Sequence, residues 1–567
     1  MNHYYTDEVN TLILISLLKA HGIKKVIASP GATNISFVGS IQYDPFFEIY
    51  SAVDERAAGF MACGLSEESG EPVVLTCTGA TASRNYIPGL TEAYYRHLPV
   101  LAVTSSQHSG RIGNYVPQVV DRSVQFADMV KRSFQLPTVN SAEDKQYTIT
   151  AVNDAILELR NGISGPVHIN LYTTYSANFV IKKLPNYRVI RRVPDCAFPK
   201  MPKGRIGVFV GAHEKFTEQE TNAIDKFCES NNAVVICDLV SNYRGKFRFL
   251  AKLPNSQDRN LGTRFFDLIV YIGYVQGDYI NFRGKESWRV NKDGVIRDPY
   301  RNLVYVFKME EIEFFNHYSK EKGKNELFQN CVNVRKKLEQ HLPELPFSNM
   351  WIAKETAHLI PENSVLHLSI LNTLRNWNYF ETPKTVLCYT NSGGYGIDGC
   401  LSSFIGSALA NRNVEHFMII GDLSFFYDVD TLFNEIPKNI HVMLINNGVG
   451  TEFKNYFHPG ALFGEDADKF IAAKGHNGFK NSNVVKSICE GRNIRYMSAS
   501  NKEDYLAQRD SWLKKGGSPV LIEIFTTDKE ESDALRLMNI IKKDFYLIKK
   551  LKKSLIGKFA KRIIRGE

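Results

Sequence analysis

Apolar and polar positions alternate along this chain on two length scales. Short runs rich in β-branched residues, each the size of one strand, are followed by longer stretches whose apolar positions repeat at the helical period of about 3.6 residues. This succession is typical of parallel sheets built from strand–helix–strand units. The strand-sized runs fall into three groups: 25–29, 48–53, 72–78, 99–105 and 166–171; then 205–211, 233–238, 268–273 and 303–309; then 364–369, 385–391, 416–422, 440–447, 494–499 and 519–526.

Two polar, proline-bearing segments separate the groups and predict linkers. They lie at residues 184–204 and 338–349. The first and third groups each have the size of a doubly wound domain. We therefore predict an α/β protein with three doubly wound parallel-sheet domains and a basic tail. The predicted bounds are 1–184 for the first domain, 200–340 for the middle domain, 350–530 for the third domain and 536–567 for the tail.

The composition is that of a globular protein. The chain has 567 residues, too many for one core, and 44% of them are hydrophobic and 23% charged. No apolar run approaches the roughly 20 residues that cross a bilayer. Asp7 and Glu8 precede the first apolar stretch, which argues against a secretion signal. We expect a cytoplasmic location.

The net charge of +9 is concentrated at the C-terminal end. Residues 536–567 contain eleven basic and two acidic residues, so the rest of the chain is electrically balanced. A balanced body does not predict nucleic-acid binding. The nine cysteines are scattered without metal-binding spacing, and we interpret them as reduced thiols, several of them inside apolar runs.

Within this tail, apolar residues recur at helical spacing with lysines between them, which predicts a basic amphipathic helix. The apolar positions are Phe545, Ile548, Leu551, Leu555, Phe559 and Ile563. One interpretation is attachment to an anionic membrane surface, which would place the protein peripherally at the inner face of the membrane. The other is a helix that packs its apolar side on the protein and exposes its lysines to solvent.

The segment "IIGDLSFFYDVDTLFNEIPKNIHVMLINNGVG" (419–450) indicates specific chemistry. Asp422 ends one strand-sized run, and Asn447 ends the next, 25 residues later. Because the carboxyl ends of parallel strands share one edge of a sheet, both side chains should arrive at the same place. Mg²⁺ accepts carboxylate, amide and phosphate oxygens, and Gly421 and Ser424 leave backbone N–H groups open to a diphosphate. The alternative is a capped turn followed by an ordinary loop.

This Gly-Asp and Asn-Asn pair resembles the thiamine-diphosphate motif of 2-oxoacid decarboxylases and carboligases. Further motifs match that superfamily in order: "SPGATN" (29–34), "VDERAAGF" (53–60) within a similar stretch at 53–105, "GNYVPQVVD" (113–121), "GPVHINL" (165–171), "NSGGYGIDG" (391–399) and "GDLSFFYD" (421–428). Within it, the last two motifs are most similar to the menaquinone-pathway synthase family, which adds succinic semialdehyde from decarboxylated 2-oxoglutarate to isochorismate. The resemblance covers roughly residues 5–175 and 350–530, and it implies pyrimidine-binding, middle and diphosphate-binding domains.

The resemblance implies roles for individual residues. Glu55 would hydrogen-bond the aminopyrimidine ring and so promote loss of the proton from the thiazolium C2, and Gln118 would lie near the reacting centre. Asp422, Asn447 and the carbonyl of Val449 would bind Mg²⁺. Other cofactor-binding residues would be Asn85, Gly394, Tyr395, Ile397, Gly421, Leu423 and Ser424. An active site shared between two subunits is implied, hence a homodimer or homotetramer.

The chain departs from the synthase pattern at the substrate-binding arginines. It has Ala32-Thr33 in place of Ser-Arg, and Gln107 and Ser392 in place of two further arginines. Guanidinium contacts to carboxylates are not replaced by Thr, Gln or Ser, so a substrate with several carboxylates is not expected. The substrate-binding candidates are Thr33, Asn34, Gln107, Ser392 and Arg375. The middle group lacks a Gly-rich dinucleotide fingerprint, so FAD is not expected.

The resulting hypothesis is a thiamine-diphosphate- and Mg²⁺-dependent enzyme that decarboxylates a small 2-oxoacid and transfers the acyl anion to an acceptor. Surface-polysaccharide assembly or secondary metabolism would be its setting. One alternative is simple decarboxylation that releases an aldehyde. An alternative of another class is a catalytically silent scaffold at a membrane, which the tail and the missing arginines suggest. The sequence identifies neither the 2-oxoacid nor the acceptor.

Overall fold

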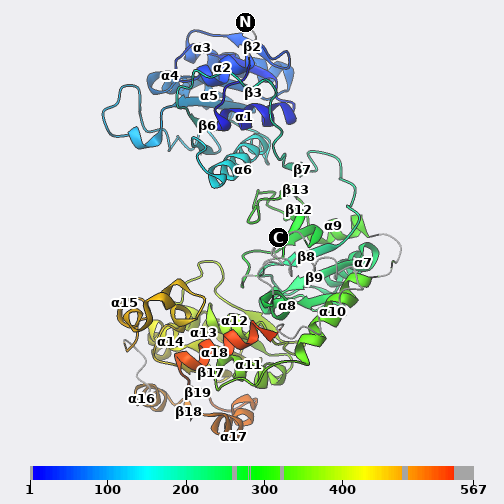
Figure 1. The fold of residues 1–567 in the computed structure, drawn as a ribbon, viewed down its shortest axis with the longest axis vertical. Coiled ribbons are helices and arrows are strands. Elements are labelled where there is room, and N and C mark those ends of the chain that lie inside the picture. Colours follow the sequence, from blue (N-terminus) through cyan, green and yellow to red (C-terminus); the bar gives the residue numbers. More distant parts are fainter. Residues whose placement is uncertain are drawn as a thin grey trace. The chain divides into compact units, whose positions relative to one another are not determined.

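The computed structural model describes residues 4–257, 265–278, 280, 282–319, 323, 325–475 and 483–541. Over these residues the chain forms three parallel sheets of six, seven and six strands, with helices between the strands (Figure 1). The predicted α/β fold with three parallel-sheet domains is confirmed. Most of the predicted amphipathic tail, residues 542–567, lies outside the described part of the chain.

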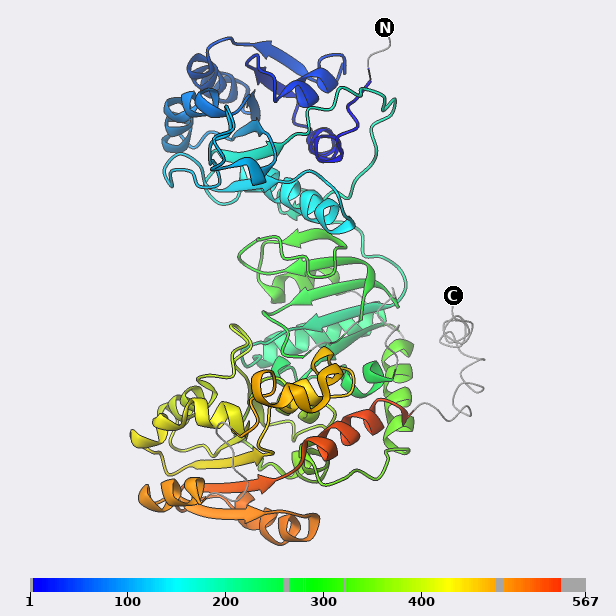
Figure 2. The ribbon, with the colours of Figure 1, turned by 60° about the vertical axis from the view of Figure 1, so that its left-hand side comes forward.

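The first sheet is parallel, with strand order β2-β1-β3-β4-β6-β5. Its strands are β1 (Lys25–Ala28), β2 (Glu48–Ser51), β3 (Val73–Cys77), β4 (Val100–Ser106), β5 (Ser133–Leu136) and β6 (Val167–Tyr172). All side chains of β3, β4 and β6 are buried, because helices cover both faces (Figure 2). One face packs against α1 (Val9–Ala20), α2 (Ile35–Ile41) and α6 (Ala142–Glu158), and the other against α3 (Glu55–Ser69), α4 (Ala80–Asn85) and α5 (Ile87–Tyr95).

Helices α3 and α5 lie in backbone contact where two glycines meet. A Cβ atom added to Gly89 would lie only 2.5 Å from the carbonyl carbon of Gly59, a distance that no larger residue tolerates. The contact holds α3 close against α5 and thereby fixes the position of its first residue, Glu55.

The middle sheet has seven parallel strands in the order β10-β9-β8-β11-β12-β13-β7. They are β7 (Arg191–Val193), β8 (Ile206–Val210), β9 (Ala233–Cys237), β10 (Arg248–Leu250), β11 (Phe266–Ile272), β12 (Gly284–Val290) and β13 (Leu303–Phe307). The associated helices are α7 (Glu218–Asn231), η2 (Leu239–Ser241), α8 (Lys252–Ser256), α9 (Glu311–Tyr318) and α10 (Glu326–Glu339). Strand β7 lies inside the segment 184–204, so the interpretation of that whole segment as a linker was wrong.

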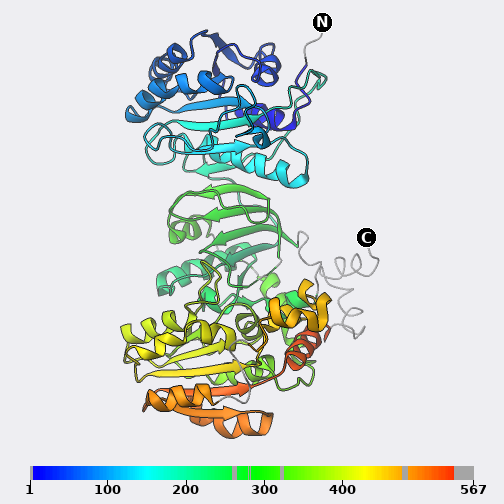
Figure 3. The same cartoon turned by 90° about the vertical axis from the view of Figure 1, so that its left-hand side faces the viewer.

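The third sheet has the order β15-β14-β16-β17-β19-β18 (Figure 3). Its strands are β14 (Val365–Leu368), β15 (Leu387–Tyr389), β16 (His416–Gly421), β17 (Ile440–Asn446), β18 (Arg495–Ala499) and β19 (Val520–Phe525). Helices α13 (Cys400–Ala410), α14 (Asp422–Tyr427) and α16 (Val484–Gly491) cover one face. Helices α11 (Asn349–Thr356), α12 (Asn372–Trp377), α17 (Lys502–Leu513) and α18 (Asp528–Met538) cover the other. The short helices η5 (Thr451–Lys454), η6 (Pro459–Asp466) and α15 (Ala467–Phe470) follow β17.

Measured by compactness, the chain divides into two units. The first consists of Met1–Pro199 with Asn291–Met309, and the second of Lys200–Val290 with Glu310–Glu567. The predicted bounds of the three domains stay predictions. None of the helices in the described residues combines the length and hydropathy needed to cross a bilayer.

Candidate functional site

Both ends of the 419–450 segment arrive at one edge of the third sheet. Strands β16 and β17 pair in parallel with Gly421 opposite Ile445, so the residues that follow them emerge side by side. Asp422 begins α14, and its Oδ2 accepts a hydrogen bond of 2.7 Å from the backbone N–H of Gly448, next to Asn447. The structure therefore brings the two halves of the motif together.

The carboxylate of Asp422 is buried and has backbone donors but no cationic partner. Its side chain is 3% exposed, and its Oδ1 accepts from the N–H of Leu423 at 2.9 Å. Burial raises the pKa of Asp422 to about 6, although the backbone N–H of Gly448 opposes this shift. In the described part of the chain no lysine or arginine forms an ion pair with it. A divalent cation would supply the missing positive charge.

The residues around Asp422 fit a Mg²⁺ ion bound mainly by oxygen. Asn447 Oδ1 accepts a long hydrogen bond of 3.3 Å from the N–H of the buried Val449. Gly448 has φ +74° and provides the tight turn between these two residues. No cluster of three His, Cys, Asp or Glu side chains exists among the described residues. One carboxylate, one amide and one carbonyl would thus leave the remaining positions to phosphate oxygens.

Open space borders the same edge. A Cβ atom added to Gly421 or to Gly394 would meet no atom within 4 Å. Ser424 donates its hydroxyl to the carbonyl of Ile397 at 2.5 Å, which ties α14 to the segment that bears Gly394 and Tyr395. The cofactor-binding candidates of the third domain therefore lie on two connected segments with room for a group between backbone N–H donors.

Tyr395 is held by a contact to the middle domain. Its backbone has φ +56°, a conformation that a tyrosine rarely adopts, and its hydroxyl donates to the carbonyl of Gly277 at 2.9 Å. This hydrogen bond fixes the direction of the Gly394–Tyr395 segment beside the candidate site.

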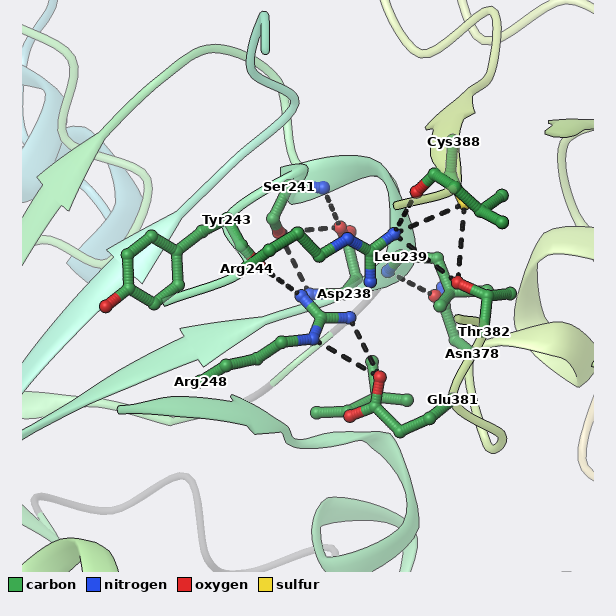
Figure 4. A network of polar contacts seen from close by, with 12 residues as sticks. Asp238, Leu239, Ser241, Tyr243, Arg244, Arg248, Asn378, Glu381, Thr382 and Cys388 are labelled. Atoms are coloured by element: carbon green, nitrogen blue, oxygen red, sulfur yellow. Dashed lines mark hydrogen bonds and ion pairs between the residues drawn. The ribbon is translucent and has the colours of Figure 1, made fainter. Parts of the chain in front are cut away.

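Polar contacts join the middle domain to the third domain within the second unit (Figure 4). Arg248 donates from Nε and Nη2 to Oε2 of Glu381, at 3.2 Å each. The backbone N–H of Leu239 donates to Oδ1 of Asn378 at 2.8 Å, and Arg244 donates to the carbonyl of Val386 at 2.7 Å. These bonds fix the η2 region against the residues around β15. They also explain how the middle domain can hold Tyr395 in place.

Of the substrate candidates in the third domain, Arg375 is already paired. Its Nη1 and Nη2 donate to the two carboxylate oxygens of Glu452 at 2.6 and 2.9 Å. Glu452 lies in η5, directly after the loop with Asn447 and Val449, so this ion pair ties α12 to the candidate metal loop. Ser392 is buried. Whether either residue contacts a substrate stays a prediction.

In the first unit, Glu55 and Asn85 lie together. Asp54 caps α3 by accepting a hydrogen bond from the N–H of Arg56, which places Glu55 at the first helical position. Asn85, at the end of α4, donates from Nδ2 to Oε2 of Glu55 at 3.4 Å. The carboxylate of Glu55 is only half-buried and faces one neutral amide donor, so it remains available to a ligand.

The remaining candidates of the first domain differ in exposure. Thr33 and Asn34 are buried, and both bond to nearby backbone: Thr33 Oγ1 donates to the carbonyl of Ser105 at 3.0 Å, and Asn34 Nδ2 to that of Ser29 at 3.0 Å. Gln107 donates to the hydroxyl of Tyr175 and accepts from Arg111. Gln118 is exposed, with φ +64°.

Two buried charged residues near these edges were missed from the sequence. Arg122 lies at the carboxyl edge of the first sheet. Glu531, in the first turn of α18, accepts from the N–H of Asn349 at 3.0 Å and the hydroxyl of Thr526 at 2.8 Å. Burial raises the pKa of Glu531 to about 7, and the charge of Asp422 contributes to the shift. In the sequence, Arg122 stands in a polar loop and Glu531 near the start of a helix. Many surface residues have such positions, so neither residue stood out.

Two comparisons with known proteins found sequence similarity to this chain. Residues 11–125 match the family described as thiamine pyrophosphate enzyme, N-terminal TPP binding domain. The chain is also similar, almost from end to end, to proteins named 2-succinyl-5-enolpyruvyl-6-hydroxy-3-cyclohexene-1-carboxylate synthase. It is 28% identical to that of Bacteroides thetaiotaomicron over 94% of this chain and 98% of the relative. It is 29% identical to that of Phocaeicola vulgatus, over 94% of this chain and 98% of the relative. It is 24% identical to that of Desulfotalea psychrophila, over 89% of this chain and 96% of the relative.

Residues 11–125 thus match the N-terminal domain of the thiamine-diphosphate-dependent enzymes. Within that class the chain is a homologue of the 2-succinyl-5-enolpyruvyl-6-hydroxy-3-cyclohexene-1-carboxylate synthases, with less than a third of its residues identical to theirs. The resemblance inferred from the motifs is thereby confirmed.

Proposed function

We propose that this protein decarboxylates a small 2-oxoacid and transfers the acyl anion to an acceptor, with thiamine diphosphate and Mg²⁺ bound. The observation that carries the proposal is the Asp422–Gly448 hydrogen bond of 2.7 Å. It joins the ends of two neighbouring strands around a buried carboxylate that forms no ion pair with a lysine or arginine among the described residues. Glu55 and Asn85, in the domain that matches the thiamine pyrophosphate family, supply the second half of the argument.

Each residue of the proposed site has a defined task. Asp422, Asn447 and the carbonyl of Val449 would hold Mg²⁺, and backbone N–H groups near Gly421 and Ser424 would hold a diphosphate. When bound, thiamine diphosphate supplies the nucleophilic carbon and the electron sink for the loss of CO₂. Glu55 would hold a proton shared with the cofactor's pyrimidine ring, and Asn85 keeps the Glu55 carboxylate oriented through its bond to Oε2.

The two halves of this site would be completed by a second copy of the chain. Apolar side chains are exposed in each half, and a dimer interface would bury them. Those of the first unit include Val53, Phe60, Tyr95, Tyr115, Val124 and Phe126, and those of the second include Tyr427, Phe433, Leu462, Phe463 and Phe470. Light scattering during gel filtration should give a dimer or a tetramer. A monomer at micromolar concentration would refute this part of the proposal.

The substrates are proposed to be a small 2-oxoacid and an acceptor that differ from those of the synthases. The arginines that the synthase resemblance implies are replaced here by Thr33, Gln107 and Ser392. Simple decarboxylation is the second candidate, since the same site without an acceptor would release an aldehyde. Mass spectrometry of the products, with and without candidate acceptors, distinguishes a ligated product from an aldehyde.

We place the enzyme in the cytoplasm, peripheral at the inner face of the membrane, in surface-polysaccharide or secondary metabolism. The basis is the excess of lysine in residues 536–567. Flotation with anionic liposomes, with and without this tail, tests the placement, and equal flotation of both forms would exclude it. A silent scaffold would also float, but it would release no CO₂ from any 2-oxoacid.

The proposed chemistry is tested by CO₂ release from a panel of 2-oxoacids, followed by the variant Glu55→Gln. We expect this variant to lose about 100-fold to 10,000-fold in turnover, because an amide cannot hold the proton that the carboxylate holds. Binding of thiamine diphosphate, measured by calorimetry, should change little. Full activity of Glu55→Gln would refute the assignment.

A further inference from the structure

A buried arginine lies at the carboxyl edge of the first sheet. The side chain of Arg122 is 1% exposed. Its Nη2 donates to Oδ1 of Asn170 on β6, whereas Nε and Nη1 have no hydrogen-bond partner in the described part of the chain. Among the residues that the structure describes, no carboxylate forms an ion pair with this guanidinium. The arginine therefore has two donor groups and one positive charge unused.

The neighbours of Arg122 do not neutralise it. Burial lowers the pKa of Arg122 to about 10, so the group is still protonated at neutral pH. His168 lies close enough to feel this charge, and burial lowers its pKa to about 3, which keeps it neutral. It shares hydrogen bonds with Thr104 and Ser133. The charge of Arg84 also acts on Arg122 and lowers its pKa. A buried cation without a carboxylate partner among the described residues is unfavourable, and it is expected where an anion binds.

The position of Arg122 relates it to the candidate site. A Cβ atom added to Gly79 would lie 3.6 Å from Nη1 of Arg122 and 3.2 Å from the carbonyls of Ser105 and Gln118. The carbonyl of Ser105 also accepts the hydroxyl of Thr33 at 3.0 Å. Nη1 of Arg122 and the backbone carbonyls of Gln118 and Ser105 therefore pack around Gly79, and Thr33 is joined to the same group through the carbonyl of Ser105.

We propose that Arg122 is a carboxylate-binding residue of the substrate site, an inference that rests on the proposed function. The guanidinium keeps N–H groups at Nε and Nη1, and each of them can donate one charge-assisted hydrogen bond to an oxygen of an anionic ligand. A carboxylate that leaves as CO₂ loses its charge in the transition state, so an arginine bound to it would slow the reaction. Arg122 therefore binds a carboxylate that survives the reaction, carried either by the far end of the 2-oxoacid or by the acceptor.

This inference changes the expectation drawn from the missing arginines. Thr33, Gln107 and Ser392 removed carboxylate contacts at the positions where the synthases have arginine. Arg122 would supply one such contact from the first unit, with its charge shielded from water and salt.

The test uses full-length protein loaded with thiamine diphosphate and Mg²⁺. Arg122→Met removes the charge at similar volume, and Arg122→Lys keeps the charge but loses the fork. Arg160→Met is the matched control, because Arg160 is an exposed arginine of the same domain that donates only to the carbonyl of Gly70. The probes are two matched acid pairs: glutarate with pentanoate for binding, and 2-oxoglutarate with 2-oxopentanoate for turnover.

The first readout is the rise in melting temperature with added glutarate, which requires no reaction. We expect the rise in the wild type and in Arg160→Met, and none in Arg122→Met. The second readout is the KM of whichever substrate carries the surviving carboxylate. It should rise about 10-fold to 100-fold in Arg122→Met, with a smaller change in kcat and partial recovery in Arg122→Lys. If the wild type prefers 2-oxoglutarate to 2-oxopentanoate and Arg122→Met abolishes this preference, the carboxylate belongs to the 2-oxoacid donor. If Arg122→Met instead raises the KM of the acceptor, the carboxylate belongs to the acceptor.

Failure of this inference is separable from failure of the proposed function. If the wild type releases CO₂ but Arg122→Met keeps its substrate KM values and its glutarate response, Arg122 is a structural residue and the inference is wrong. If no 2-oxoacid is decarboxylated but glutarate stabilises the wild type and not Arg122→Met, the proposed reaction is wrong while the carboxylate site stands. If Arg122→Met does not fold, the same comparison is made with Arg122→Lys.

Discussion

The carboxyl edges of the first and third sheets have the same architecture and opposite charge. Each is the edge of a six-stranded parallel sheet with helices on both faces. The third edge buries the carboxylate of Asp422 among backbone donors. The first buries the guanidinium of Arg122 beside the amide of Asn170. Neither group has an oppositely charged partner among the residues that the structure describes. On the proposed function, the fold would set where a ligand binds, and the charge at each edge would set which part of the ligand it receives.

The two edges also differ in how firmly their loops are held. The loop after β17 is tied to α12 by the bidentate Arg375–Glu452 pair. The loop that bears Gln118 has mostly exposed side chains, and it has positive φ angles at Gly113, Tyr115 and Gln118. A metal-diphosphate site needs fixed ligand distances, and a site that must admit different substrates benefits from a looser loop.

Removing the negative charge of Asp422, at the edge of the third sheet, should have the largest effect on activity. Asp422→Asn keeps the size of the side chain but removes the charge that balances a divalent cation, so CO₂ release should fall by more than about 100-fold. Asp430→Asn, an exposed neighbour in the same segment, should keep wild-type activity. An Asp422→Asn variant that still responds to Mg²⁺ with wild-type affinity would show that the edge holds no cation.

The second largest effect is expected from breaking the Arg375–Glu452 ion pair, which holds the loop after β17. Glu452→Gln leaves the largely buried Arg375 without its carboxylate, and we expect a loss of about 3 kcal/mol in the free energy of unfolding. Weaker Mg²⁺ binding should accompany it, because η5 follows the metal loop directly. In the double variant with Arg375→Met the loss should be smaller than the sum of the two single losses. Simple additivity would mean that the pair does not act as a unit.

A smaller effect concerns pH. The pKa of Glu531 is about 7 in the folded protein, above its ordinary value of 4.5, so the folded state binds more protons between these values. Stability should therefore fall as the pH rises from about 4.5 to 7, with a contribution from Glu531 of roughly 3 kcal/mol. Asp422 adds a slope of the same sign at lower pH. Urea unfolding of Glu531→Gln should show a flatter pH dependence between pH 5 and 7, and an unchanged slope would contradict the assignment.

Much of the fold could be predicted because its strands are buried on both sides. Runs such as those of β16 and β17 are almost entirely apolar, apart from His416 and His441, and end in turn residues. Strands β5, β10 and β12 were missed. The sequence of β12, "GKESWRV", carries three charges and a serine in seven residues, yet most of its positions are buried by the strands and helices that surround it. Strand β7 lay in a segment whose prolines suggested a linker. These segments form strands because the rest of the fold buries them, and this burial cannot be read from their local composition.

The candidate site could be predicted only as far as short-range patterns reach. Asp422 and Asn447 follow neighbouring apolar runs, so sheet topology alone brings them together. The importance of Arg122 depends on Asn170, 48 residues away, and that of Glu531 on Asn349, 182 residues away. Burial of a charge by such distant partners leaves no local signature in the sequence.

The central claim is that the edge with Glu55 in one copy and the edge with Asp422 in another form one active site. It is tested by mixing two inactive variants, Glu55→Gln and Asp422→Asn, under conditions that exchange subunits. In a mixed dimer one of the two shared sites is intact, so random mixing should restore about a quarter of the wild-type rate of CO₂ release. If each site were built within a single chain, no mixed dimer would contain an intact site. A mixture that exchanges subunits and stays inactive would contradict the account.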